Sequence, residues 1–397
     1  MNVLIPSHIF AGKWITNDEF CDLPPRNVYH RQLNKVKFDC SEHRNRHILF
    51  RRRFSCTAPI GKATLYITAD DYYKLYVNGQ LVTMGPAPAY HFQYNYNQLD
   101  ITPYLTKGEN VIAVHTLYQG LINRTWQSGD CRHGLLLDLE IDGQTVLCSD
   151  EGFLTAVHSA YREIGTVGYD TGFLEEYDSR APEVGFECPD FDDRTWKPAR
   201  VAGHADHTLV PQATEQLVFE KIAPVSRLNR ENTVMLDFGS NYVGYLCAMV
   251  KGKSGDVITV HMGQELCDDG SVRHQLRANC TYEEKWILCN GESVLDQYDY
   301  KAFRYASLTL PEGCELLDVY LLARHYPFVL AAKMKPDYAD DPDLKRIWAL
   351  CANTLKYGVQ EAVLDCVDRE KGYYVGDGCY SALAHMILTG KDDMLAS

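Results

Sequence analysis

The stretch YKLYVNGQLVTM, residues 73–84, decides the fold class. Its two halves, YKLYV and QLVTM, are short apolar-rich segments on either side of Asn78-Gly79, and this dipeptide is the strongest short-range signal for a β-hairpin. The same pattern recurs where LLLDLEI (135–141) and QTVLCS (144–149) flank Asp142-Gly143. Further strands are expected at residues 63–69 and 110–119. The first half of the chain is therefore predicted to be antiparallel β structure.

A second block of short strands follows after residue 230. Its segments are TVMLDFGSNYVGYLCAMV (233–250), GDVITVHMGQEL (255–266), FRYASLTL (303–310) and LLDVYLLARHY (316–326). Strands at this spacing, separated by Gly and Asp turns, favour sandwiches over βαβ units. We expect two antiparallel, jelly-roll-like β-sandwich domains at residues 1–205 and 206–330, with Trp196 closing an edge of the first.

The pattern becomes helical in DDPDLKRIWALCANTLKYGVQEAV, residues 340–363. Asp341 is the expected N-cap and Pro342 the first helical residue. An apolar stripe at helical spacing follows at Leu344, Ile347, Trp348, Cys351 and Leu355. A second helix is expected in GCYSALAHMILTG (378–390), with Asp377 as its N-cap and Gly390 at its end. Residues 331–397 are thus predicted to form a separate helical domain.

Composition limits the classes of partner. The formal net charge is −14, which argues against nucleic acid and anionic membrane surfaces because both require a basic face. No signal peptide is recognised at the N-terminus and no apolar run is long enough for a membrane span, so we expect a cytoplasmic protein. The 14 cysteines are scattered without a Cys-x-x-Cys pair. They are expected to be reduced and mostly buried, with no metal site.

The helices are joined by DCVDREKGYYVGD, residues 365–377, called here the signature loop. It brings four carboxylates, an arginine, a lysine and two adjacent tyrosines together. A charged loop between helices is usually only solvated, and Asp377 could be no more than a cap. Two adjacent aromatic residues and two glycines are not needed for solvation, however. Carboxylates beside aromatic faces suit sugar chemistry, in which an acid protonates the leaving oxygen and carboxylates bind hydroxyl groups.

The signature loop resembles that of the bacterial α-L-rhamnosidases, glycoside hydrolase family 78, which reads roughly Asp-Cys-x-x-Arg-Glu-x-x-x-Trp-x-Gly-Asp. The matching residues are Asp365, Cys366, Arg369, Glu370, Gly376 and Asp377. Further similar segments are RRRF (51–54), LYVNGQLV (75–82), GPAP (85–88), LDITPYLTKGENVIAV (99–114), LDFGSNYVG (236–244), GQEL (263–266) and YKAFRYASL (300–308). The resemblance covers most of the chain.

The resemblance implies a function and roles for the loop residues. The activity would be inverting hydrolysis of terminal α-L-rhamnosyl or related deoxy- or L-sugar residues, in an (α/α)6 barrel and without a cofactor. Glu370 would be the general acid. Asp365, Arg369 and Asp377 would bind the sugar, and Tyr374 would supply the stacking ring where the family has tryptophan. A rhamnose-containing glycoside or oligosaccharide is the implied partner, and a homo-oligomer is compatible with it.

Two features depart from the family pattern. Tyr374 and Val367 replace the usual tryptophan and proline, which bears on the identity of the sugar more than on the reaction class. Residues 341–397 suffice for two helices, whereas twelve helices of about 12 residues with loops need on the order of 200 residues. We therefore expect an incomplete barrel, a general base outside this chain, and no activity of this chain alone.

A different class of function stays open on the sequence. The aromatic-rich GPAPAYHFQYNYNQLD, residues 85–100, could line a sugar groove in a non-catalytic carbohydrate-binding β-sandwich protein, although such tyrosines are more often core residues. The signature loop discriminates between the two hypotheses, because a binding module has no use for Arg369-Glu370 beside Asp377.

Overall fold

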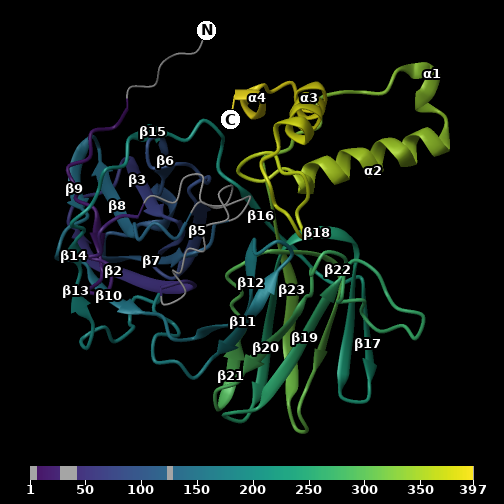
Figure 1. The fold of residues 1–397 in the computed structure, drawn as a ribbon, viewed down its shortest axis with the longest axis horizontal. Helices are drawn as coiled ribbons and strands as arrows, with labels where there is room; N and C mark the ends of the chain where they lie inside the picture. The colour runs from purple at the N-terminus through teal and green to yellow at the C-terminus, as the bar shows by residue number, and fades with distance from the viewer. Residues whose placement is uncertain (1–6, 27–42, 123–127, 397) are drawn as a thin grey trace. The chain divides into compact units, whose positions relative to one another are not determined.

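The computed structural model describes residues 7–26, 43–122 and 128–396. Residues 1–6, part of the N-terminal stretch in which no signal peptide was recognised, lie outside the described residues. The chain folds into two compact units: residues 1–159 and 181–212 belong to unit 1, and residues 160–180 and 213–397 to unit 2 (Figure 1). The sequence placed a single boundary near residue 205 and missed the excursion at 160–180. The helical segment belongs to unit 2, and its status as a separate domain stays a prediction.

Unit 1 is a β-sandwich of two sheets. The seven-stranded sheet has the order β14-β1-β8-β3-β6-β15, with β9 paired to β8. Its strands are β1 (Ile15–Thr16), β3 (Ala63–Asp70), β6 (Tyr94–Asp100), β8 (Gly134–Ile141), β9 (Gln144–Cys148), β14 (Arg200–Val201) and β15 (Leu209–Pro211), and the 3-10 helix η1 (Thr102–Tyr104) follows β6. The six-stranded sheet has the order β13-β10-β2-β7-β4-β5. Its strands are β2 (Arg46–Cys56), β4 (Tyr72–Val77), β5 (Gln80–Gly85), β7 (Gly108–Tyr118), β10 (Leu154–Val157) and β13 (Lys197–Pro198).

The core of unit 1 lies between the inward faces of these sheets. Phe50, Leu65, Val114 and Leu137 are completely buried there, and burying each such side chain contributes roughly 1.5–3 kcal/mol. Both predicted hairpins are confirmed, as β4–β5 and β8–β9. Their turns need positive φ at two successive residues, which Asn-Gly and Asp-Gly adopt readily. At the first turn φ is 51° for Asn78 and 82° for Gly79.

Unit 2 contains one continuous ten-stranded sheet, with the order β11-β12-β20-β19-β22-β18-β23-β16 and with β17 and β21 paired to β18. Its strands are β11 (Tyr161–Val167), β12 (Gly172–Asp178), β16 (Val218–Ile222), β17 (Ser226–Arg230), β18 (Thr233–Gly252), β19 (Val257–Gly263), β20 (Glu283–Ile287), β21 (Gly291–Val294), β22 (Lys301–Thr309) and β23 (Glu315–His325).

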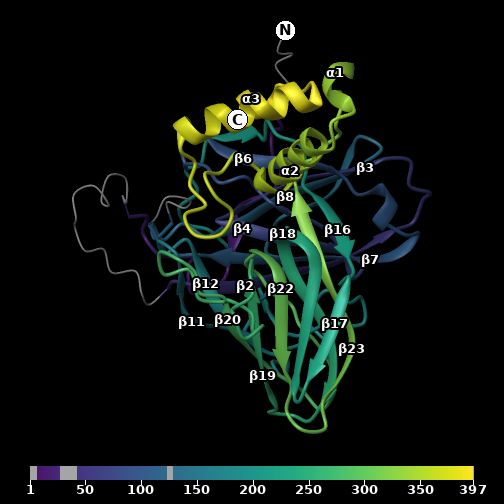
Figure 2. The same ribbon diagram turned by 90° about the vertical axis from the view of Figure 1, so that its right-hand side faces the viewer.

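The strands of this sheet that lie within residues 206–330 pair with one another antiparallel, as predicted. The parallel pair involves residues 160–180, which the prediction assigned to the first domain. β12 runs parallel to β20, and the 20-residue β18 links both halves of the sheet. Between Asp237 and Tyr242 the register of β18 with β22 shifts, and Gly239 there has a φ of 82°. β18 pairs with β17 before this bulge, with β22 on both sides of it, and with β21 and β23 after it. Figure 2 shows β18 beside β23, in agreement with their register.

Four helices end the chain: α1 (Pro336–Ala339), α2 (Pro342–Gly358), α3 (Val375–Thr389) and α4 (Asp393–Ala396). The predicted start of α2 is confirmed, because the Asp341 carboxylate accepts hydrogen bonds from the backbone N–H groups of Asp343 and Leu344. In the described residues no helix has both the length and the apolar character that crossing a membrane requires.

The apolar stripe of α2 is partly uncovered. Ile347 is 55% exposed and Cys351 is also exposed, whereas Leu344 and Trp348 are half-buried. Leu355 packs against a small cluster around Tyr326 and Val359. The expectation that the cysteines are mostly buried is also wrong. All 13 described cysteines are free, and only Cys21, Cys56, Cys131 and Cys280 are buried. Cys40 lies outside the described residues.

Candidate active site

The signature loop is closed by its own first aspartate. The Asp365 N–H donates to the carbonyl of Gly372 at 3.0 Å, and the Gly372 N–H donates to Asp365 Oδ1 at 2.7 Å. Lys371 lies between these contacts with a φ of 49°, which completes the reversal of the chain. Asp365 therefore shapes the loop through one oxygen, in addition to any role in binding a ligand.

Glu370 is positioned by Tyr374. The Tyr374 hydroxyl donates to Glu370 Oε2 at 2.8 Å, and the Glu370 N–H contacts Cys366 Sγ at 3.3 Å. The tyrosine ring passes directly over Gly372, where a Cβ atom would lie only 2.8 Å from Tyr374 Cε2. Glycine is therefore required at this position if the ring is to reach Glu370. Both Glu370 and Tyr374 are half-buried.

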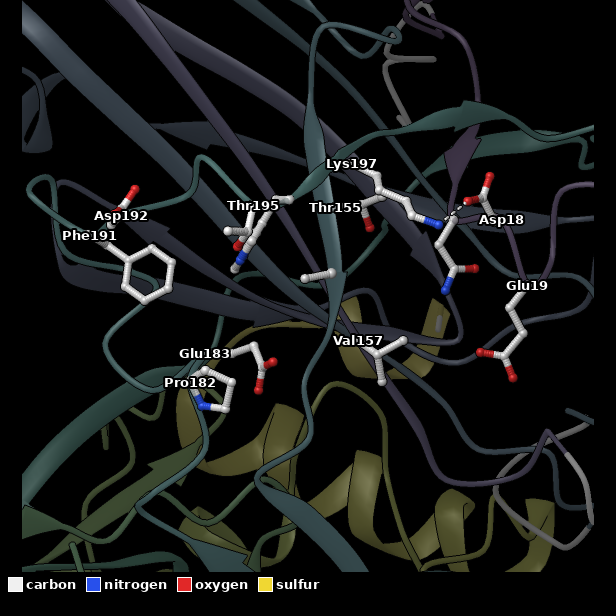
Figure 3. A pocket seen from close by; sticks show the side chains of 13 residues that line it. Asp18, Glu19, Thr155, Val157, Pro182, Glu183, Phe191, Asp192, Thr195 and Lys197 are labelled. Carbon is white, nitrogen blue, oxygen red and sulfur yellow. Dashed lines mark hydrogen bonds and ion pairs between the residues drawn. The ribbon is translucent and has the colours of Figure 1, made fainter.

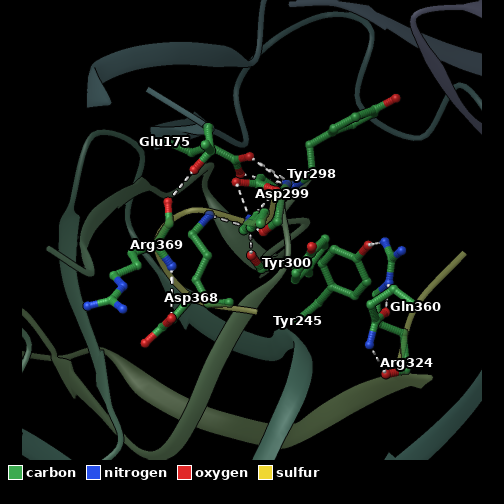
Figure 4. A network of polar contacts seen from close by, with 12 residues as sticks. Glu175, Tyr245, Tyr298, Asp299, Tyr300, Arg324, Gln360, Asp368 and Arg369 are labelled. Atoms are coloured by element: carbon green, nitrogen blue, oxygen red, sulfur yellow. Dashed lines mark hydrogen bonds and ion pairs between the residues drawn. The ribbon is translucent and has the colours of Figure 1, made fainter. Parts of the chain in front are cut away.

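The middle of the loop is attached to the turn between β11 and β12. The Arg369 carbonyl accepts a hydrogen bond from the Thr171 hydroxyl at 2.6 Å. A Cβ atom at Gly168 would lie 2.1 Å from this carbonyl oxygen, so only glycine permits the approach. The Arg369 guanidinium points away from these contacts (Figure 4). The backbone of Arg369 thus attaches the loop to this turn, while its side chain lies beside Cys366 of the same loop.

Asp368 joins the loop to the excursion between β19 and β20. Its carbonyl accepts from the Tyr282 hydroxyl at 3.0 Å, and its Oδ2 accepts from Gln264 Nε2 at 3.2 Å. Tyr282 is completely buried. The position of Asp368 is consequently set by the sheet of unit 2.

Lys371, to which the sequence assigned no role, is buried beneath the loop. Its Nζ lies 3.1 Å from Asp299 Oδ1, donates to the Tyr300 carbonyl at 3.1 Å and sits 3.9 Å from the centre of the Tyr300 ring. Burial lowers the pKa of the lysine, and the Asp299 carboxylate opposes that shift. No local pattern could reveal this contact, because the partners are separated by more than seventy residues of chain.

A second buried group holds Asp299 in turn. The Glu175 carboxylate accepts from the N–H groups of Tyr298 at 3.0 Å and Asp299 at 2.8 Å (Figure 4). Lys301 Nζ donates to the Asp299 carbonyl at 3.0 Å and pairs with Glu284 Oε1 at 2.8 Å. Burial raises the pKa of Glu175 to about 7. A carboxylate and a lysine inside unit 2 therefore support the strand end that carries the loop.

The segment leading into the loop is held by Arg324 of β23. Its guanidinium pairs with Glu361 Oε1 at 2.6 Å, and both side chains are at least nine-tenths buried. It also donates to Gln360 Oε1 at 2.9 Å and to the Tyr245 hydroxyl at 2.9 Å (Figure 4). A buried arginine thus ties the end of α2 to the sheet.

Asp377 stands apart from the other predicted site residues. The prediction that it caps the second helix is wrong: Tyr374 is at the N-cap position, and Asp377 lies in the first turn of α3. The helix starts earlier than expected, at Val375, because Tyr374, whose hydroxyl contacts Glu370, occupies the N-cap position. Asp377 is exposed, and among the described residues its carboxylate has no hydrogen bond or ion pair. The predicted end at Gly390, with a φ of 78°, is confirmed.

One cluster has the composition of a metal site. Among the described residues, His261, His274 and Glu283 place one possible ligand atom each within 4.8 Å of one another. The two imidazole rings stack in parallel with centroids 3.9 Å apart, so a cation between them would lie outside both ring planes. His261 Nε2 instead contacts Glu283 Oε2 at 2.9 Å. The arrangement fits a hydrogen bond between His261 and Glu283 better than metal coordination.

Comparison with known proteins agrees with the motifs. Residues 58–220 match the family model of the α-L-rhamnosidase N-terminal domain, and residues 227–318 match that of the bacterial α-L-rhamnosidase concanavalin-like domain. An α-L-rhamnosidase of Streptomyces avermitilis is 25% identical over 266 residues, which are 63% of this chain and 25% of that protein. One of Formosa agariphila is 25% identical over 362 residues, which are 83% of this chain and 36% of that protein.

Solved structures share the fold. A family 78 rhamnosidase of Bacillus sp. GL1 has a TM-score of 0.83 at 16% identity, covering 98% of this chain and 62% of that one. An α-L-rhamnosidase of Dictyoglomus thermophilum has a TM-score of 0.74 at 20% identity, covering 96% and 42%. The alignments thus span 25% to 36% of the two curated relatives described above. The two matched family models together cover more than half of the chain, which belongs to the bacterial α-L-rhamnosidase family, glycoside hydrolase family 78.

Proposed function

We propose that this chain is the part of a glycoside hydrolase that carries its general acid, and that the enzyme removes terminal α-L-rhamnosyl or related deoxy- or L-sugar residues with inversion. The observation that carries the proposal is the hydrogen bond from Tyr374 to Glu370 within the family's signature loop. This contact holds one carboxyl oxygen in place. A fixed carboxyl group beside a stacking ring is what protonation of a departing glycosidic oxygen requires.

Glu370 is the proposed proton donor, and the remaining loop residues bind the sugar. The Arg369 side chain is the proposed donor to the sugar hydroxyls, because the contact that attaches the loop to the turn between β11 and β12 is made by the backbone of this residue. Asp365 binds while it also closes the loop on Gly372. Asp377, in the first turn of α3, extends the polar surface towards the ligand. Tyr374 has a second proposed role as the residue that positions Glu370.

An inverting glycosidase also needs a carboxylate base, roughly 6.5–9.5 Å from the acid, with a water between the base and the sugar. The family resemblance implies that this base belongs to another part of the helical barrel. The acid and the base then belong to different parts of the complete enzyme. We propose accordingly that the 397-residue chain does not turn over rhamnosides by itself.

The test uses a protein in which this chain is continued by the rest of the barrel. Glu370→Gln should lower kcat by a factor of roughly 10²–10⁴ on a rhamnoside with a poor leaving group, because the departing oxygen loses its proton donor. An aryl rhamnoside with an activated leaving group should be affected much less. Glu312→Gln, at an exposed position of unit 2, is the matched control. Equal losses on both substrates would contradict the role of Glu370.

Two further substitutions separate binding from proton transfer. Asp365→Asn and Asp377→Asn should reduce activity on both substrates to the same extent, because these carboxylates hold the sugar and do not protonate the leaving group. Asp365→Asn should in addition loosen the loop, since Oδ1 accepts the Gly372 N–H. A non-catalytic sugar-binding protein would instead show no turnover with either substrate, even when the barrel is complete.

A further inference from the structure

Unit 1 contains a groove that the signature loop does not contribute to. Its volume is about 550 Å³, and its lining includes Asp18, Glu19, Thr155, Glu183, Trp196 and Lys197 (Figure 3). These residues come from the segment after β1, from β10, and from the chain around β13. All of them belong to unit 1. The volume falls within the usual range of small-molecule sites, which is roughly 300–1,000 Å³.

The groove contains a buried hydroxyl group that has no hydrogen-bond partner. Thr155 lies in the middle of β10 and is 5% exposed, and its Oγ1 makes no hydrogen bond in the structure. Buried hydroxyl groups are nearly always hydrogen-bonded, because losing water without a replacement partner is costly. The Thr155 hydroxyl therefore has a hydrogen bond to offer to a molecule that enters the groove.

The cover over this hydroxyl is weak enough to open. Thr155 is the cross-strand neighbour of Lys197, whose Nζ lies 2.9 Å from Asp18 Oδ2, with the two side chains 75% and 48% exposed. Figure 3 shows Thr155 beside this pair. Exposed ion pairs contribute little to stability. A ligand can therefore separate Lys197 from Asp18 and use the ammonium, the carboxylate and the Thr155 hydroxyl together.

Aromatic side chains lie on the other side of β10. Trp196 and Phe191 pack edge to face with centroids 5.6 Å apart, and both are half-buried. Pro182 and Glu183 lie next to them in the lining (Figure 3). Aromatic rings offer flat apolar faces, and a pyranose presents a face of C–H groups of similar extent. The groove thus combines stacking faces with hydrogen-bonding groups.

The charges in the groove select the class of ligand. The carboxylates of Asp18, Glu19 and Asp192 already pair with Arg200, Arg46 and Arg194. The groove therefore carries little net charge, which favours a neutral ligand. Hydroxyl groups can donate to carboxylates and accept from the lysine. A peptide strand is disfavoured, because β13 already covers the edge of β10 at Leu154 and Thr155. We propose that the groove is an accessory binding site for a neutral oligosaccharide.

The proposal is tested by calorimetric titration of the 397-residue chain. The probes are a neutral rhamnose-containing trisaccharide, cellotriose and, as the anionic counterpart, trigalacturonic acid. At least one neutral trisaccharide should bind with a Kd on the order of 1 mM, and trigalacturonic acid should not bind. Thr155→Val should weaken binding about tenfold, because it removes one hydrogen bond from a nearly unchanged side-chain shape. Thr155→Ser, which keeps the hydroxyl, should restore it.

Control variants distinguish binding at this groove from binding at the signature loop. They also distinguish weaker binding from a loss of folding. Thr145→Val, at an exposed position of β9, should change nothing. Glu370→Gln should leave binding at the groove intact, whether or not Glu370 is the general acid. Thr155→Val should not lower Tm, since it removes an unsatisfied buried group. Failure of both neutral sugars to bind at about 10 mM, an affinity unchanged by Thr155→Val, or binding abolished by Glu370→Gln alone would each overturn the proposal.

Discussion

The signature loop and the helices on either side of it are held in opposite ways by unit 2. The loop is fixed by buried polar contacts to the sheet, most directly through Lys371, which is 3% exposed. The helices turn large apolar side chains to solvent: Ile347, Leu350, Val375, Tyr380 and Ile387 are 55% to 87% exposed. The difference shows that the position of the loop is set by the β structure, whereas the helices depend on packing that the described residues do not supply.

The contrast between loop and helices bears on how Glu370, the proposed acid, is positioned. Glu370 is oriented by Tyr374, and the loop that carries both rests on strand ends of unit 2 through Asp299 and Thr171. The acid can therefore be in place before the barrel is complete. What the barrel would add is the base and the walls that exclude water.

The largest expected effect follows from this separation. The isolated 397-residue chain should show no turnover of an aryl α-L-rhamnoside, because an ordered acid without the opposing base cannot activate the attacking water. The measurement is the release of the aryl group at high protein concentration, with Glu370→Gln run in parallel. Steady turnover that disappears in Glu370→Gln would show that the helices of this chain already complete an active site.

The next effect concerns the contact that ties the end of α2 to the sheet. Glu361→Ala would leave the buried Arg324 guanidinium without its carboxylate partner, although the bonds to Gln360 and Tyr245 remain. Breaking a buried pair in this way typically costs about 3–5 kcal/mol. Chemical unfolding of unit 2, with the exposed Glu312→Ala as control, measures it. A change below about 1 kcal/mol, as at a surface pair, would mean that the sheet does not hold this segment.

A third effect is pH-dependent and acts on the loop alone. Burial raises the pKa of Glu175 from 4.5 to about 7, so the folded state holds this proton more tightly than the unfolded state. The contribution of Glu175 to the free energy of unfolding is greatest below about pH 4.5. It declines as the pH rises to about 7, by about 3 kcal/mol in total. Glu175→Gln, which cannot ionise, should therefore gain about 2–3 kcal/mol relative to wild type between pH 5 and pH 8.

Limited proteolysis shows where this pH effect acts. Burial disfavours ionised Glu175, so its ionisation destabilises the folded segment that contains Asp299, which in turn holds Lys371. Cleavage within the signature loop should increase between pH 5 and pH 8 in wild type and not in Glu175→Gln. Cleavage in α2 should be the same at both pH values. Equal pH dependence in both proteins would show that Glu175 does not control the loop.

The sequence predicted those parts of the structure that local rules determine. Asn78-Gly79 fixed a hairpin because few other residues accept its backbone angles, and Asp341-Pro342 fixed the start of α2 through its cap. The loop residues Asp365 and Glu370 were found because their types and order match a family motif, and Tyr374 because it stands where the motif has an aromatic residue. The structure joins Tyr374 to Glu370 and Asp365 to Gly372. Their catalytic and binding roles stay predictions.

The sequence could not predict the contacts that hold the loop. Thr171, Asp299 and Gln264 reach it from strand ends far away along the chain, and hydrophobic periodicity carries no information about such pairs. The transfer of residues 160–180 to unit 2 was missed for the same reason, because β11 and β12 look like any other hairpin until their pairing with β20 is known. Asp377 was misplaced because Asp is a good cap in general, whereas here the ring of Tyr374 determines where the helix starts.

The smallest expected effect tests the other side of the comparison. Ile347→Ser and Leu350→Ser replace side chains of α2 that already lie in solvent, so in the isolated chain each should change the free energy of unfolding by less than about 0.5 kcal/mol and raise solubility. Leu355→Ser is the matched variant on the same helix, and it should cost more because Leu355 packs against Tyr326 and Val359. In a protein with a complete barrel, the first two substitutions should each cost about 1.5–3 kcal/mol, the value of burying such a side chain. Urea unfolding of both proteins measures the difference. Losses of equal size in the isolated chain and in the protein with a complete barrel would mean that these positions are already packed. The helices would then not need further helices to cover them.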